Sequence, residues 1–145
     1  MRSVILSLLV TVTLSHQQQT DISDLCSALS TIHYKIFPLS SEIKKSYCKA
    51  ERYVCSAFEM FASNDFAKEV VVIKEKLGCY PDRPSEGMMQ SDLCNSLRVL
   101  PDTSKKSLYE LYSRDQKRMS TFKPLLAEMR VTSEEWLMPI LEQYC

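Results

Sequence analysis

Six cysteines constrain this chain more than any other feature of its sequence. They all follow an apolar N-terminal stretch and lie at Cys26, Cys48, Cys55, Cys79, Cys94 and Cys145. An even number of cysteines in an exported chain of this size is typical of a disulfide framework. A zinc site is the competing interpretation, but the closely spaced Cys or His pairs typical of zinc ligands are missing from the sequence. We therefore expect three disulfides, no metal and no other cofactor.

The N-terminus has the pattern of a secretory signal peptide. Arg2 precedes an apolar run over residues 4–14, and Thr13 and Ser15 supply small side chains just before a cleavage site. This run is shorter than the roughly 20 apolar residues that a membrane-spanning helix needs. The sequence thus predicts a signal peptide over 1–15, one secreted domain over 16–145 and no membrane span.

The composition favours helices joined by short turns. Only 2 of the 145 residues are glycine, fewer than a β-sandwich rich in tight hairpins would use. The whole chain has 18 basic and 18 acidic residues, so removing Arg2 with the signal leaves a net charge of about −1. Balanced charge argues against a nucleic-acid-binding protein.

Apolar residues recur at steps of three and four along the chain, which predicts amphipathic helices. Pro38 should end the first helix, Gly78 should end the third, and Thr132 with Glu135 forms a capping box for the last. The predicted helices cover about 21–37, 40–62, 64–77, 91–100, a segment after Asp102, and a segment after Thr132. Residues 70–73 are β-branched and also fit a buried strand, but their apolar stripe favours a helix. We expect an all-α fold, a single bundle of five to six helices stapled by three disulfides.

Helix geometry restricts how the cysteines pair. On one helix, Cys48 and Cys55 would have Cα atoms about 10.5 Å apart, whereas a disulfide tolerates about 7 Å. This excludes a Cys48–Cys55 bond. If the chain turns near 38–39 and 63–64, the expected bonds are Cys48–Cys79, Cys26–Cys55 and Cys94–Cys145. An interlocked alternative has Cys26–Cys55, Cys48–Cys94 and Cys79–Cys145.

The sequence offers no catalytic motif. Of the two histidines, His16 lies beside the predicted cleavage site, which leaves His33. No zinc-protease, nucleophile-elbow or phosphate-loop pattern accompanies it. With every cysteine oxidised there is also no thiolate nucleophile. We therefore predict that the protein is not an enzyme.

Two sets of residues are candidates for binding. His33, Tyr112 and Asp115 are polar groups on apolar helix faces, so together they form a candidate ligand pocket; a satisfied core histidine and a solvent-exposed Asp115 are the alternatives. Residues 104–130 carry seven basic and three acidic side chains. This predicts a patch for an anionic partner, unless the residues simply form a solvated helix face. Its candidate residues are Lys105, Lys106, Arg114, Lys117 and Arg118.

Two classes of function fit these features. The first is a secreted protein that acts by extracellular protein–protein interaction, as an effector, inhibitor or signalling-like factor. The second is an extracellular carrier of a small hydrophobic ligand. An internal cavity above roughly 300 Å³ would favour the carrier, whereas a filled core with an exposed patch would favour the interaction protein. The closely spaced apolar stripes favour the interaction protein.

Overall fold

The computed structural model describes residues 2–49 and 51–145, with side chains from residue 21 onward. This part of the chain forms five α-helices and no strand, which confirms the all-α prediction. The helices are α1 (Arg2–Tyr47), α2 (Arg52–Leu77), α3 (Gln90–Thr103), α4 (Lys106–Tyr112) and α5 (Gln116–Tyr144). The predicted signal peptide lies outside the residues whose side chains are described.

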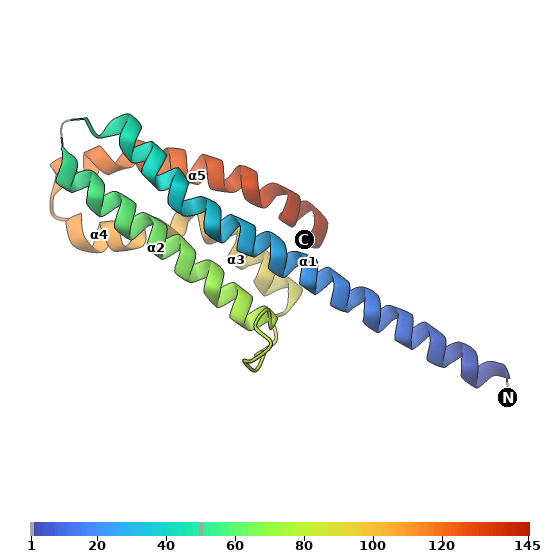
Figure 1. Ribbon diagram of the computed structural model, residues 1–145. Helices are drawn as coiled ribbons and strands as arrows, with labels where there is room; N and C mark the ends of the chain where they lie inside the picture. The colour runs from blue at the N-terminus through green and yellow to red at the C-terminus, as the bar shows by residue number, and fades with distance from the viewer. Residues whose placement is uncertain (1, 50) are drawn as a thin grey trace.

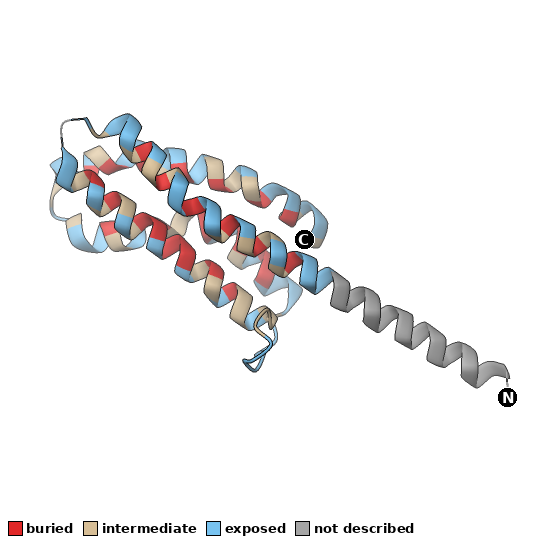
Figure 2. Ribbon diagram, viewed as in Figure 1, coloured by how far each residue is buried: buried red, intermediate tan, exposed pale blue. Residues whose placement is uncertain are grey.

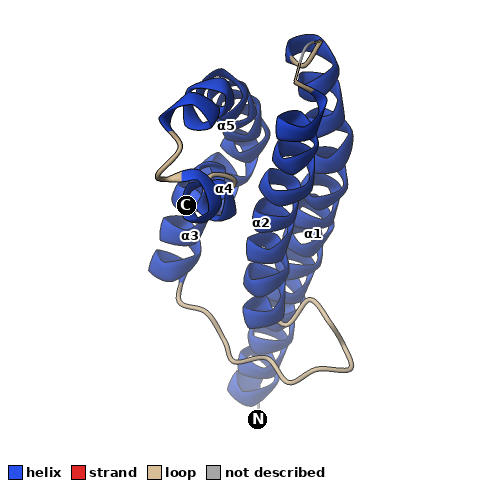
Figure 3. Ribbon diagram, turned by 90° about the vertical axis from the view of Figure 1, so that its left-hand side faces the viewer, coloured by secondary structure: helices blue, strands red, loops and turns tan. Residues whose placement is uncertain are grey.

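The helices form two antiparallel pairs. α1 and α2 run side by side, and α3 packs against α5, with the short α4 beside α2 (Figures 1 and 3). α1 also packs along α5 and α2 along α3, so the two pairs share one core. Figure 2 shows the buried residues of the helices facing one another across this core.

Large side chains fill the centre of the core. Phe58, Phe66 and Phe122 have no solvent exposure. The rings of Phe58 on α2 and Phe122 on α5 stack with centroids 6.4 Å apart, so this contact joins the two helix pairs.

The prediction that Pro38 ends the first helix is wrong. α1 continues through Pro38 to Tyr47. A proline inside a helix costs about 3 kcal/mol. Ile36 and Ile43, on either side of it, lie on the same buried face, and burying each side chain contributes about 1.5–3 kcal/mol. Pro38 itself is on the solvent-exposed side, where water can reach the carbonyl group that loses its hydrogen bond.

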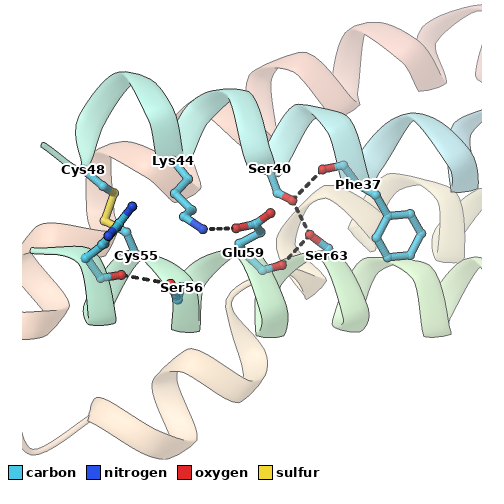
Figure 4. Close-up of polar contacts among 9 residues, drawn as sticks. Phe37, Ser40, Lys44, Cys48, Cys55, Ser56, Glu59 and Ser63 are labelled. Carbon is cyan, nitrogen blue, oxygen red and sulfur yellow. Dashed lines mark hydrogen bonds and ion pairs between the residues drawn. A yellow bond between two sulfur atoms is a disulfide. The ribbon is translucent and has the colours of Figure 1, made fainter.

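The predicted second and third helices are also displaced. The chain turns over 48–51, and α2 runs without a break through Ser63 and Asn64, where a turn was expected. Ser63 does not cap a helix but is buried, and its hydroxyl hydrogen-bonds to that of Ser40 on α1 (Figure 4). Residues 70–73 are helical, as predicted.

Gly78 ends α2, as expected. Its φ of 76° lies in the left-handed region that favours glycine. Its N–H donates to the carbonyl oxygen of Glu75, and the N–H of Cys79 donates to that of Lys74 at 2.9 Å. These two bonds form a Schellman motif, which satisfies carbonyl groups at the helix end.

The structure forms three disulfides but corrects two of the three favoured pairings. Cys94–Cys145 is confirmed, with Cα atoms 5.7 Å apart. The other bonds are Cys26–Cys79 and Cys48–Cys55. Excluding Cys48–Cys55 was wrong because its premise, one helix containing both residues, does not hold. The turn at 48–51 brings their Cα atoms to 5.9 Å.

The C-terminal half also differs from the prediction in its helix ends. α3 includes Pro101, and α5 contains both Pro124 and Pro139. Thr132 and Glu135 lie inside α5, so the predicted capping box does not start a helix. The break comes earlier, at 113–115, between α4 and α5.

Candidate functional site

Two turns meet at one end of the bundle and form an open depression there. The turns are 48–51, between α1 and α2, and 113–115, between α4 and α5 (Figure 1). The depression has a volume of about 530 Å³, within the range of ligand-binding pockets. It is lined by Glu51, Arg52, Tyr53, Val54, Asp115, Lys117 and Arg118.

The Cys48–Cys55 disulfide holds one side of this depression in place. Cys55 is buried in the core, at 1% exposure, so the bond ties the turn to the packed interior. α2 begins inside the loop that the disulfide closes, at Arg52. The next residue, Tyr53, points away from the core and is 94% exposed. A large aromatic side chain is thus held at the anchored start of α2 in full contact with solvent.

Asp115 holds the other side in place. Its carboxylate accepts a hydrogen bond from the backbone N–H of Arg118 at 3.0 Å and therefore caps α5. The Nε of Arg118 lies 3.4 Å from the same carboxylate. The Arg118 guanidinium also lies over the ring of Tyr112, 5.5 Å from its centroid. Asp115 is thus a helix cap at the rim of the depression.

Five basic side chains lie at this end of the bundle, three of them in the lining of the depression, and we call this set the basic end. All five are exposed, and they lie in the two turns or at the starts of α2 and α5. They are Lys49, Arg52, Arg114, Lys117 and Arg118. Among the described residues, Arg118 alone of the five has a carboxylate within ion-pairing distance. Most of the positive charge at this end therefore faces solvent.

The structure divides the predicted anion patch into two parts. Arg114, Lys117 and Arg118 belong to the basic end. Lys105 and Lys106 lie at the other end of α4 and line a different depression between α3 and α4, with a volume of about 650 Å³. Lys105 is paired there with Asp102, with 3.0 Å between Nζ and Oδ1.

None of the described contacts joins His33 to Tyr112 or Asp115, so the structure does not assemble the predicted ligand pocket as one site. His33 is half-buried on α1, and its ring lies 5.4 Å from that of Tyr34 and 5.9 Å from that of Phe37. Burial and the charge of Lys74 lower the pKa of His33. Tyr112 packs instead against Phe122, with ring centroids 5.4 Å apart.

The sequence prediction missed Lys49, Arg52 and Tyr53. The sequence places these residues in the middle of the helix predicted over 40–62, far from residues 114–118. The signal that would have identified them is the seven-residue spacing of Cys48 and Cys55, which also fits a disulfide closing a turn between two helices.

No family model, curated protein or solved structure matches this chain. Among the described residues, no helix is both long enough and apolar enough to cross a membrane.

Proposed function

We propose that this protein is secreted and acts without catalysis, by binding an extracellular protein through the basic end. Secretion is supported by the N-terminal sequence pattern and by the cysteines, all six of which are paired in three disulfides. Such bonds persist in oxidising compartments and are rare in the cytosol.

The observation that carries the proposal is the exposure of Tyr53 among basic side chains. Tyrosine and arginine are the residues most enriched, together with tryptophan, among those that dominate binding energy at interfaces. Tyr53 is 94% exposed, and Arg52 precedes it. A folded protein gains little by presenting an aromatic ring to water, so an interface offers a reason for its position.

The packing of the core favours surface binding over the carrier alternative. Phe58, Phe66 and Phe122 fill the middle of the bundle without exposure. The depressions at the basic end and between α3 and α4 are lined by exposed or half-exposed residues. A carrier would enclose most of its ligand's surface, for which an open depression is poorly suited.

Site-specific photocrosslinking tests this proposal. A benzoylphenylalanine at position 53 should form one covalent adduct with a partner in the extracellular fluid of the protein's own source. The matched control has the same group at Tyr34, which is 74% exposed on α1. Equal adducts at both positions, or none at position 53, would contradict the proposal.

Processing of the N-terminus gives a separate test of secretion. We expect the secreted protein to begin at His16 or Gln17 and to contain no free thiol. N-terminal sequencing and alkylation without reductant measure both properties. An N-terminus at Met1, or two labelled cysteines, would show that the secretion part of the proposal is wrong.

A further inference from the structure

We infer that the basic end binds an acidic peptide segment of its partner. This inference rests on the proposed function and specifies its chemistry. In this arrangement, carboxylates of the segment contact Arg52 and Lys117, and an apolar or aromatic side chain of the segment packs on Tyr53.

The positions of the unpaired cations support an extended anionic ligand. Arg52 comes from α2 and Lys117 from α5, and both line the same depression. Neither has a carboxylate within ion-pairing distance among the described residues. Guanidinium groups bind carboxylates with two parallel hydrogen bonds, and lysine adds a flexible point charge. A ligand with two separated carboxylates would satisfy both groups at once.

The lining also contains groups that favour a peptide over a simple anion. Tyr53 and Val54 give the depression an apolar part, beside the cations. Its volume of about 530 Å³ is larger than a single carboxylate or phosphate needs. A short peptide segment offers both carboxylates and an apolar side chain within that volume.

Two acidic residues make the depression unsuitable for a uniform polyanion. Glu51 and Asp115 line the same depression as its cations. A sulfated polysaccharide carries negative charge along its whole length, so part of it would face these carboxylates and be repelled. A peptide can place neutral residues against Glu51 and Asp115. The pattern of charge therefore favours an acidic protein segment over a polysaccharide.

The site is organised before the ligand arrives. The Cys48–Cys55 bond anchors the start of α2, and the Asp115 cap fixes the start of α5. Binding then requires little ordering of the backbone, which lowers the entropic cost of association.

Fluorescence anisotropy with a defined probe tests the inference on the oxidised full-length protein. The probe is a labelled heptapeptide with a central tyrosine, one acidic residue on each side of it and neutral residues at the other positions. We expect it to bind, and we expect the double variant Arg52→Ser/Lys117→Ser to weaken binding by about tenfold. The matched control, Lys105→Ser/Lys106→Ser, also removes two positive charges and should change the affinity less than about twofold.

A heparin hexasaccharide and the variant Glu51→Gln distinguish the two kinds of polyanion. We expect the hexasaccharide to bind wild-type protein more weakly than the peptide does. Glu51→Gln removes one carboxylate that repels the hexasaccharide, so it should narrow the difference in affinity between the two ligands. Tighter binding of the hexasaccharide to the wild type, no binding of the peptide, or equal losses in the two double variants would each overturn the inference.

The two proposals fail in different ways. A crosslinked partner at position 53, together with no binding of the acidic peptide, would support the interaction surface but contradict its acidic ligand. Absence of both results would remove the proposed site altogether.

Discussion

The α1–α2 pair and the α3–α5 pair are both antiparallel, but different interactions hold them together. Disulfides close the α1–α2 pair at both ends, through Cys26–Cys79 and Cys48–Cys55. Polar contacts cross between the helices at three levels within this frame, two of them drawn in Figure 4. The contacts are Lys74 with Ser30, Ser63 with Ser40, and Lys44 with Glu59.

The α3–α5 pair has a covalent link at one end and, toward the other end of α3, an exposed ion pair between Arg130 on α5 and Asp102 on α3, with 3.7 Å between Nε and Oδ1. Cys94–Cys145 joins the start of α3 to the end of α5, and the side chain of Gln90 donates to the carbonyl oxygen of Tyr144 at 2.8 Å. The rest of the pair contributes buried apolar side chains to the core: Leu97, Leu100, Leu137 and Ile140.

This difference affects how precisely the helices of each pair are aligned, as well as how stable the pair is. Hydrogen bonds and ion pairs are directional, so the polar contacts favour one alignment of α1 against α2. Apolar contacts are less directional, and they stabilise α3 against α5 mainly through the area that they bury. The N-terminal pair is therefore aligned mainly by specific polar partners. The C-terminal pair is aligned mainly by packing and one covalent bond, because its Arg130–Asp102 ion pair is exposed and contributes little.

The largest effect should come from breaking the contact between the two pairs. Phe122→Ala removes a fully buried ring that stacks on Phe58. Leaving a cavity at such a site costs about 3–5 kcal/mol of unfolding free energy. Urea denaturation measures this loss. Tyr53→Ala is the control because its ring is exposed, and its effect should stay within about 0.5 kcal/mol. Equal losses would mean that Phe122 does not join the pairs.

The disulfides should differ in their contribution according to the length of chain that each encloses. Cys26 and Cys79 are 53 residues apart, whereas Cys48 and Cys55 are 7 apart. In the chain-entropy model, replacing both cysteines by serine costs about 4 kcal/mol for the first bond and about 2.5 kcal/mol for the second. Denaturation of the two double variants measures the difference. A larger loss from Cys48→Ser/Cys55→Ser would show that this bond mainly supports the folded turn.

The sequence predicted which segments are helical better than it predicted where the helices begin and end. Apolar periodicity reports which face is buried, and that face continues through Pro38 and through Ser63. Proline, serine and asparagine are typical of helix ends, but burial on both sides of them outweighs these local preferences. The real turn at 48–51 contains neither proline nor glycine, so turn propensity does not mark it, and the spacing of Cys48 and Cys55 is the signal that could have placed it.

The candidate site could be predicted only in part, for the same reason. Arg114, Lys117 and Arg118 are close together in the sequence and were therefore identified. Arg52 and Tyr53 join them through the packing of α2 beside α4 and α5, a tertiary contact that depends on the position of the turn. If the turn is not predicted, the sequence gives no reason to place Arg52 and Tyr53 beside residues 114–118.

A smaller effect should come from the buried hydroxyl contact between α1 and α2. Ser40 and Ser63 hydrogen-bond to each other: one hydroxyl donates to the other, and the accepting hydroxyl donates to a carbonyl oxygen of its own helix. Ser40→Ala and Ser63→Ala should each cost about 1 kcal/mol. The double variant should cost less than the sum of the single variants, because the second substitution removes a contact already lost. Additive losses in a double-mutant cycle would show that the two hydroxyls do not interact.

The smallest effect should be a dependence of stability on pH through His33, which is half-buried on α1. Burial, and then the positive charge of Lys74 on α2, lower its folded-state pKa below 6.5. Just below pH 6.5 the unfolded chain therefore binds a proton that the folded chain does not, so stability falls as pH decreases through this window. Below the folded-state pKa both states are protonated and the loss is complete.

His33→Gln should remove this contribution of His33 to the pH dependence. Lys74→Gln should reduce it without removing it, because burial is the larger cause. Denaturation at several pH values between about 5 and 7.5 measures the slope. Stability that increases toward low pH only when His33 is present would contradict the sign argued here.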